Sequence, residues 1–199
     1  SSLDIMMNTT KREYNCDHLD CSEPKIIIAN HQSFLDILRM IALSSKVVLM
    51  TNEWVFKSPF FGIIIRYAGY VRAAKGIDQN IDAVKELIAD GVSVVIFPEG
   101  TRSVDGKIQR FHKGAFYLAE KLNVTIQPIL IHGNSYTMSK GDYILKNSYM
   151  NLKALPSITV EDKTFGVGYK ERAKRIAAYY REELAIFSQE SEGSDFQFD

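Results

Sequence analysis

A histidine stands just after a short, strongly apolar segment near the start of the chain, and an aspartate lies five residues later. The apolar segment is Ile26–Ala29, the histidine is His31 and the aspartate is Asp36. An imidazole titrates near neutral pH, so His31 is a candidate base for a hydroxyl group that attacks an ester or thioester. A nearby carboxylate would fix the tautomer of the ring and stabilise the imidazolium that forms.

Helical geometry restricts how this pair can meet. Two side chains five residues apart on one helix point about 140° away from each other, because the helix turns once every 3.6 residues. Contact therefore requires His31 in the turn before the helix and Asp36 in its first turn, and Ser33 is a good N-cap for such a helix. The segment 33–36 also fits the S-x-x-[DE] capping pattern, so a purely structural role for Asp36 stays open.

A second polar segment follows another apolar segment, Val92–Phe97, and reads PEGTR. The guanidinium of Arg102 offers bidentate donors that suit a phosphate, and Thr101 adds a hydroxyl donor. Gly100 would let the backbone approach a ligand closely. Glu99 is placed to accept a hydrogen bond from a substrate hydroxyl or to orient Arg102 by an ion pair, and an ordinary turn with an internal salt bridge is the alternative.

Apolar segments alternate with amphipathic ones along the chain, which is typical of βαβ units. We therefore predict an α/β fold with a mostly parallel central sheet flanked by helices. The predicted strands cover 9–14, 26–29, 46–50, 68–71, 92–97, 126–131 and part of 143–160, and the predicted helices cover 34–43, 78–89, 114–122 and 169–187. We predict one domain over residues 1–187 and an acidic, disordered tail over 188–199.

Three of the predicted strands end in loops that carry reactive side chains. His31 follows the first, Arg72 and Lys75 follow a short strand near residue 70, and the PEGTR segment follows Val92–Phe97. If these strands run parallel, all three loops emerge at one edge of the sheet, where α/β proteins bind ligands. Further positive charge follows at Lys107, Arg110 and Lys113.

Composition limits the partners that the chain is expected to have. Acidic and basic residues are balanced at 24 each, so no global field argues for nucleic acid. The longest apolar stretch is too short to cross a bilayer, and the segment Asn52–Ile65 predicts either a core helix or an apolar wall for an acyl chain or membrane interface. Cys16 and Cys21 are expected to be free thiols, and the first residue, Ser1, suggests a portion of a longer protein.

Two segments carry a resemblance to a known family. Residues 30–36, NHQSFLD, resemble the NHxxxxD motif of the glycerolipid acyltransferases of the 1-acylglycerol-3-phosphate (lysophosphatidic acid) acyltransferase type. Residues 97–103, FPEGTRS, match that family's second strong motif letter for letter, and IQPI at 126–129 resembles a later apolar block. The resemblance spans residues 25–131 and implies a glycerol-3-phosphate acyltransferase-like fold.

The resemblance implies a direct transfer of an acyl group to a lysophospholipid hydroxyl. His31 would be the general base and Asp36 would orient it, while the donor would be acyl-CoA or an acyl carrier protein thioester, with no acyl-enzyme. No metal and no cofactor is implied, and a membrane surface would be a partner, either at the cytoplasmic face or as the soluble domain of a larger membrane protein. The acceptor phosphate would be held by Glu99, Gly100, Thr101 and Arg102, with Arg72 or Lys75. Lys75 stands in the register where the family usually has arginine, and Arg72 precedes it by three residues.

Three other functions stay open on the sequence alone. A metal-dependent hydrolase would use His31, Asp36, Glu99 and His132 as ligands, although no H-x-x-x-H or H-x-x-E-H spacing supports it. A lipid-binding domain that has kept the fold without activity is the second, and O-acylation of an amino-acid lipid is the third. The acceptor, the acyl chain length and the carrier of the donor are not determined by these residues.

Overall fold

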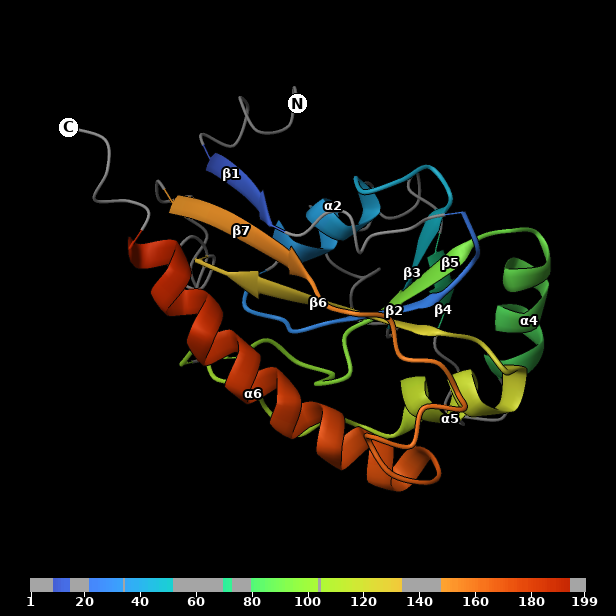
Figure 1. The fold of residues 1–199 in the computed structure, drawn as a ribbon. Helices are drawn as coiled ribbons and strands as arrows, with labels where there is room; N and C mark the ends of the chain where they lie inside the picture. The colour runs from blue at the N-terminus through green and yellow to red at the C-terminus, as the bar shows by residue number, and fades with distance from the viewer. Residues whose placement is uncertain are drawn as a thin grey trace.

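The computed structural model describes residues 9–14, 22–33, 35–51, 70–72, 80–103, 105–133 and 148–193. Within these ranges the strands form one seven-stranded sheet in the order β1-β7-β6-β2-β5-β3-β4 (Figure 1). The strands are β1 (Thr9–Tyr14), β2 (Ile26–Ala29), β3 (Val47–Thr51), β4 (Tyr70–Arg72), β5 (Ser93–Ile96), β6 (Ile126–His132) and β7 (Ser148–Ala154). The helices are α2 (Leu35–Ile41), α4 (Ile81–Ala89), α5 (Gly114–Leu122) and α6 (Tyr169–Gly193).

Neighbouring strands run parallel everywhere in this sheet except between β6 and β7. The central strand β2 is paired on both sides, with β5 and β6, and all four of its residues are buried. A strand covered on both faces needs apolar side chains at every position, which explains its continuous apolar sequence. The predicted α/β fold with a mostly parallel sheet is confirmed.

The helices cover the two faces of the sheet unequally (Figure 1). Ile26 and Ile28 of β2 pack into a core shared with α4, α5 and α6. The alternate residues, Ile27 and Ala29, pack into a second core shared with α2. Successive side chains of a strand point to opposite faces, so β2 contributes to both cores and its end is fixed from both sides.

The last helix extends beyond its predicted end. Residues 188–193 were predicted as disordered tail, but α6 continues to Gly193. Phe187 and Ser191 are both fully buried, and Lys153 of β7 pairs with Glu190 at 3.2 Å. Packing against β7 therefore keeps the acidic end of the helix folded, and residues 194–199 lie outside the described residues.

Several predictions concern residues that the structure does not describe. The apolar segment Asn52–Ile65, both cysteines and Lys75 lie outside the described ranges. Among the helices that are described, none combines the length and the apolar character needed to cross a bilayer.

Candidate active site

The NHQSFLD and FPEGTRS segments meet at one edge of the sheet because their strands are parallel neighbours. Ile26 and Ile28 of β2 pair with Val94 and Ile96 of β5, so the two strands end side by side. The backbone N–H of His31 donates to Glu99 Oε1 at 2.8 Å, and Ser103 N–H donates to the His31 carbonyl at 2.8 Å. Residues far apart in sequence thus hold the histidine's main chain on both sides.

His31 and Asp36 form a buried pair. The distance between His31 Nδ1 and Asp36 Oδ2 is 3.0 Å, and the aspartate is fully buried while His31 is 7% exposed. In the tautomer in which Nδ1 donates to this carboxylate oxygen, Nε2 keeps its lone pair for a substrate proton. The ring also stacks on Phe97, with centroids 4.3 Å apart, which fixes its plane.

The same aspartate oxygen closes the start of α2. Asp36 Oδ2 accepts the backbone N–H groups of Gln32 and Ser33 at 2.6 and 2.8 Å, in addition to the imidazole. Leu35 N–H also approaches the Ser33 hydroxyl at 3.4 Å. One carboxylate therefore makes both the capping contacts and the contact with the histidine ring, and the catalytic role of the pair stays a prediction. The helix cap holds the carboxylate in place for the ring.

Glu99 has a different set of partners from those that the sequence suggested. Its Oε1 accepts the His31 N–H and its Oε2 accepts the Gln109 N–H at 2.7 Å, and the residue is 3% exposed. Among the described residues it forms no ion pair with Arg102. Burial raises the pKa of the Glu99 carboxyl above its ordinary value, and the two backbone hydrogen bonds oppose that rise. Glu99 therefore ties the β5 loop to the catalytic candidate, and its predicted contact with substrate stays a prediction.

The remaining motif residues form the rim of the site. Gly100 has φ of +68°, a left-handed conformation that favours glycine, and a Cβ atom built there would lie a close 3.2 Å from Cδ2 of His112. Thr101 is exposed and Arg102 is half-buried. Arg72 ends β4 and pairs in register with Thr51, so it stands at the same sheet edge, separated from β5 by β3.

Two residues without a role predicted from the sequence brace the end of β2. The Asn30 amide bonds both backbone groups of Ile131 on β6, with Nδ2 donating at 2.9 Å and Oδ1 accepting at 2.8 Å. The hydroxyl of Tyr180 on α6 is inserted between the strands: it donates to the Ile28 carbonyl at 2.7 Å and accepts the Ile129 N–H at 3.1 Å. Asn30 belongs to the first motif, but nothing in the local sequence around Tyr180 signals this bridge.

The residues that a metal-dependent hydrolase would use as ligands do not form a metal site. Within the described residues, no three His, Cys, Asp or Glu side chains are grouped so that they could hold a metal ion. Both oxygens of Glu99 face backbone N–H groups, and the ring of His132 packs edge-on against Phe187 with centroids 6.1 Å apart. The chemistry that this geometry offers is proton transfer: an imidazole nitrogen with a free lone pair, backed by a buried carboxylate, beside a loop with a guanidinium and a hydroxyl.

Comparison with known proteins points to one family. The sequence model described as Acyltransferase matches residues 10–132. The chloroplastic 1-acyl-sn-glycerol-3-phosphate acyltransferase LPAT1 of Arabidopsis thaliana is 37% identical over 123 residues, which is 59% of this chain and 34% of that protein. The human 1-acyl-sn-glycerol-3-phosphate acyltransferase alpha is 28% identical over 153 residues, 74% of this chain and 54% of that protein. The chain thus spans only part of the length of these relatives.

A solved structure shares the fold. The crystal structure of the 1-acyl-sn-glycerophosphate acyltransferase PlsC from Thermotoga maritima aligns with a TM-score of 0.73 and 24% sequence identity, covering 91% of this chain and 74% of that one. The family match contains both motifs that build the site and extends over more than half of the residues. The chain therefore belongs to the acyltransferase family.

Proposed function

We propose that the chain transfers a fatty acyl group from a thioester to the hydroxyl of a lysophospholipid such as 1-acylglycerol-3-phosphate. The observation that carries this proposal is the 3.0 Å contact between His31 and the buried Asp36, beside the FPEGTRS loop. The relatives' names, which refer to 1-acyl-sn-glycerol-3-phosphate acyltransferases, support the choice of acceptor.

The proposed reaction uses His31 as a base and then as an acid. Its Nε2 takes the proton of the acceptor hydroxyl while the oxygen attacks the thioester carbonyl carbon. The tetrahedral intermediate then collapses, the carbon–sulfur bond breaks, and the departing thiolate takes the proton from the imidazolium. Asp36 stabilises the imidazolium between these two transfers through its bond to Nδ1. The acyl group passes directly to the acceptor, and the mechanism requires no metal or cofactor.

The acceptor's phosphate is assigned to the rim of the site. Arg102 is half-buried and offers a bidentate guanidinium, while the exposed Thr101 supplies a hydroxyl donor. Arg72, at the end of β4, stands at the same sheet edge and can add a second positive charge. The lipid acceptor also requires a membrane surface as partner, so we propose that the domain works at the cytoplasmic face, either peripherally or as part of a longer membrane protein.

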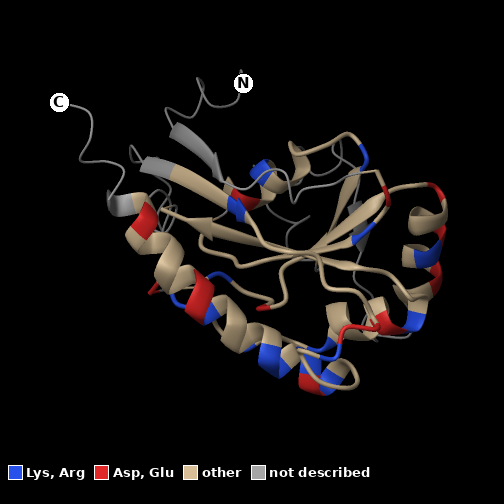
Figure 2. Cartoon of the chain, in the orientation of Figure 1, with Lys and Arg blue, Asp and Glu red and all other residues tan. Residues whose placement is uncertain are grey.

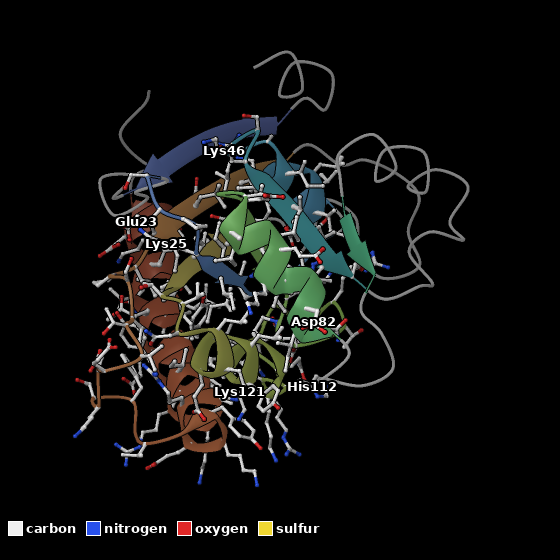
Figure 3. All side chains as sticks on the ribbon, turned by 90° about the vertical axis from the view of Figure 1, so that its right-hand side faces the viewer. Glu23, Lys25, Lys46, Asp82, His112 and Lys121 are labelled. Atoms are coloured by element: carbon white, nitrogen blue, oxygen red, sulfur yellow. The ribbon has the colours of Figure 1, made fainter. Side chains whose placement is uncertain are left out.

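A thiol-release assay tests the proposal. The protein is incubated with acyl-CoA or acyl carrier protein thioester, with and without 1-acylglycerol-3-phosphate, and an amino-acid lipid serves as an alternative acceptor. We expect acceptor-dependent thiol release that His31→Ala abolishes. The matched control is Asp82→Ala, an exposed position on α4 (Figure 3), which should keep the full rate. Full activity in His31→Ala would contradict the assigned base. Lipid binding without turnover for any acceptor would favour the inactive lipid-binding alternative.

A further inference from the structure

A groove of about 560 Å³ lies between the first half of α6 and the segment that precedes α5. Figure 2 shows Lys and Arg positions along this part of α6. Five of the residues that line the groove are cationic and none is acidic, and its apolar lining comes from Phe111 and two alanines of α6. The cationic residues are Arg110, Lys113, Lys170, Lys174 and Arg181.

Among the described residues, the cations that line the groove form no ion pairs, although Glu171, one turn away on α6, interacts electrostatically with Lys174. Glu171 pairs with Arg175 of the same helix at 2.6 Å, outside the groove. Lys170 and Lys174 are four residues apart on α6, so they face the groove together and repel each other. A bound anion would relieve that repulsion, and a concave site of this volume suits a small ligand.

The groove shares a wall with the active-site loop. Gln109 N–H donates to Glu99 at 2.7 Å, and His112 N–H donates to the Pro98 carbonyl at 2.7 Å. Arg110 and Lys113 alternate with these residues in sequence and line the groove. The segment 109–113 therefore contacts the FPEGTRS loop through its backbone and presents its positive side chains to the groove.

We propose that this groove binds the phosphorylated nucleotide end of coenzyme A, so that acyl-CoA is the donor; this inference rests on the proposed acyl transfer. Coenzyme A carries a diphosphate and a separate phosphomonoester, which need several cations, and the groove provides five with no acidic residue in its lining. Arginine guanidinium groups also stack on aromatic rings such as adenine. The acceptor's single phosphate is already assigned to Arg102, so the two anionic substrates use separate sites.

Calorimetric titration with adenosine 3′,5′-bisphosphate tests the groove without turnover. We expect the wild-type protein to bind it and Lys174→Ala to weaken the binding about tenfold, as expected for the loss of one charged contact. The matched control is Lys121→Ala on α5 (Figure 3), which lies outside the groove and should bind as the wild type does. No binding by the wild type, or equal binding by Lys174→Ala, would overturn the assignment.

Kinetics with two donors supply the second readout. Lys174→Ala should raise the KM for acyl-CoA about tenfold with kcat unchanged, and should leave the KM for S-acyl pantetheine, which has no phosphates, as it is. The proposal would be overturned if Lys174→Ala changed the KM only for acyl carrier protein donors. It would also be overturned if this variant lost binding to phosphatidic acid vesicles while its nucleotide binding stayed unchanged. If the protein binds the nucleotide but shows no turnover, the proposed acyl transfer is refuted and the groove remains a nucleotide site. If it shows turnover but does not bind the nucleotide, the groove assignment is refuted and the proposed acyl transfer stands.

Discussion

The replacement of Asp36 by asparagine separates the two tasks of this residue. In the structure its Oδ2 accepts three hydrogen bonds, one from the His31 ring and two from the backbone N–H groups of Gln32 and Ser33. The asparagine carbonyl oxygen can still accept the backbone bonds, so the start of α2 should remain closed. What the variant loses is the negative charge beside the imidazole.

The size of the effect follows from the 3.0 Å separation of His31 Nδ1 and Asp36 Oδ2. Opposite unit charges 3–4 Å apart attract by about 4 kcal/mol at an effective dielectric constant of about 20. This stabilises the imidazolium that forms as the acceptor loses its proton, and it is absent in Asp36→Asn. Since about 1.4 kcal/mol corresponds to a factor of ten in rate, we expect kcat to fall by about 10³.

The assay is acceptor-dependent thiol release at saturating substrates, combined with thermal unfolding to establish that the variant is folded. The same substitution at an exposed site, Asp82→Asn, is the control and should keep the wild-type rate. A folded Asp36→Asn protein with kcat within about tenfold of the wild type would refute the role given to the charge, because that loss corresponds to no more than about 1.4 kcal/mol.

Three further substitutions test the supports of the site. Tyr180→Phe removes the hydroxyl that bridges β2 and β6, so the free energy of unfolding in urea should fall by about 1–3 kcal/mol, whereas Tyr179→Phe, at a partly exposed position, should change it little. Gly100→Ala forces a side chain into a left-handed conformation against a neighbouring imidazole and should cost about 1–2 kcal/mol, while Gly114→Ala meets no atom within 4 Å and should not destabilise the protein. Glu99→Gln should change how stability depends on pH. Burial raises the pKa of Glu99 in the folded state above its ordinary 4.5, so the wild type loses stability as pH rises through that folded-state pKa, and the glutamine variant lacks this loss.

For each of these three predictions, one experimental result would contradict the reasoning. Equal unfolding free energies for the two tyrosine variants would show that the hydroxyl bridge contributes nothing measurable. A Gly100→Ala protein as stable as Gly114→Ala would remove the argument from backbone conformation. For Glu99, a difference in stability between wild type and variant that stays constant from pH 4 to pH 8 would show that burial does not perturb this carboxyl.

The strand and helix pattern is predictable because it depends on local periodicity. Ile26–Ala29 is apolar at every position, which is what a strand buried on both faces requires, and Gly114–Leu122 begins and ends at the predicted residues. The end of α6 is not predictable in this way, because it depends on contacts distant in sequence rather than on local periodicity. Its last turns are polar in sequence, and they are held by contacts with β7, such as Lys153–Glu190, that span 37 positions.

The candidate site also has features that the sequence predicts and features that only the tertiary structure shows. The sequence determined which residue types follow which strands, and it predicted that His31 and the PEGTR segment would emerge at one edge of the sheet if those strands run parallel, as they do. Only the tertiary structure decided that Glu99 binds the backbone of His31 and that Tyr180 bridges β2 and β6. Those contacts join residues 68 and 152 positions apart. Buried polar groups must find partners wherever packing brings them, and local sequence does not specify which chain segment will arrive there.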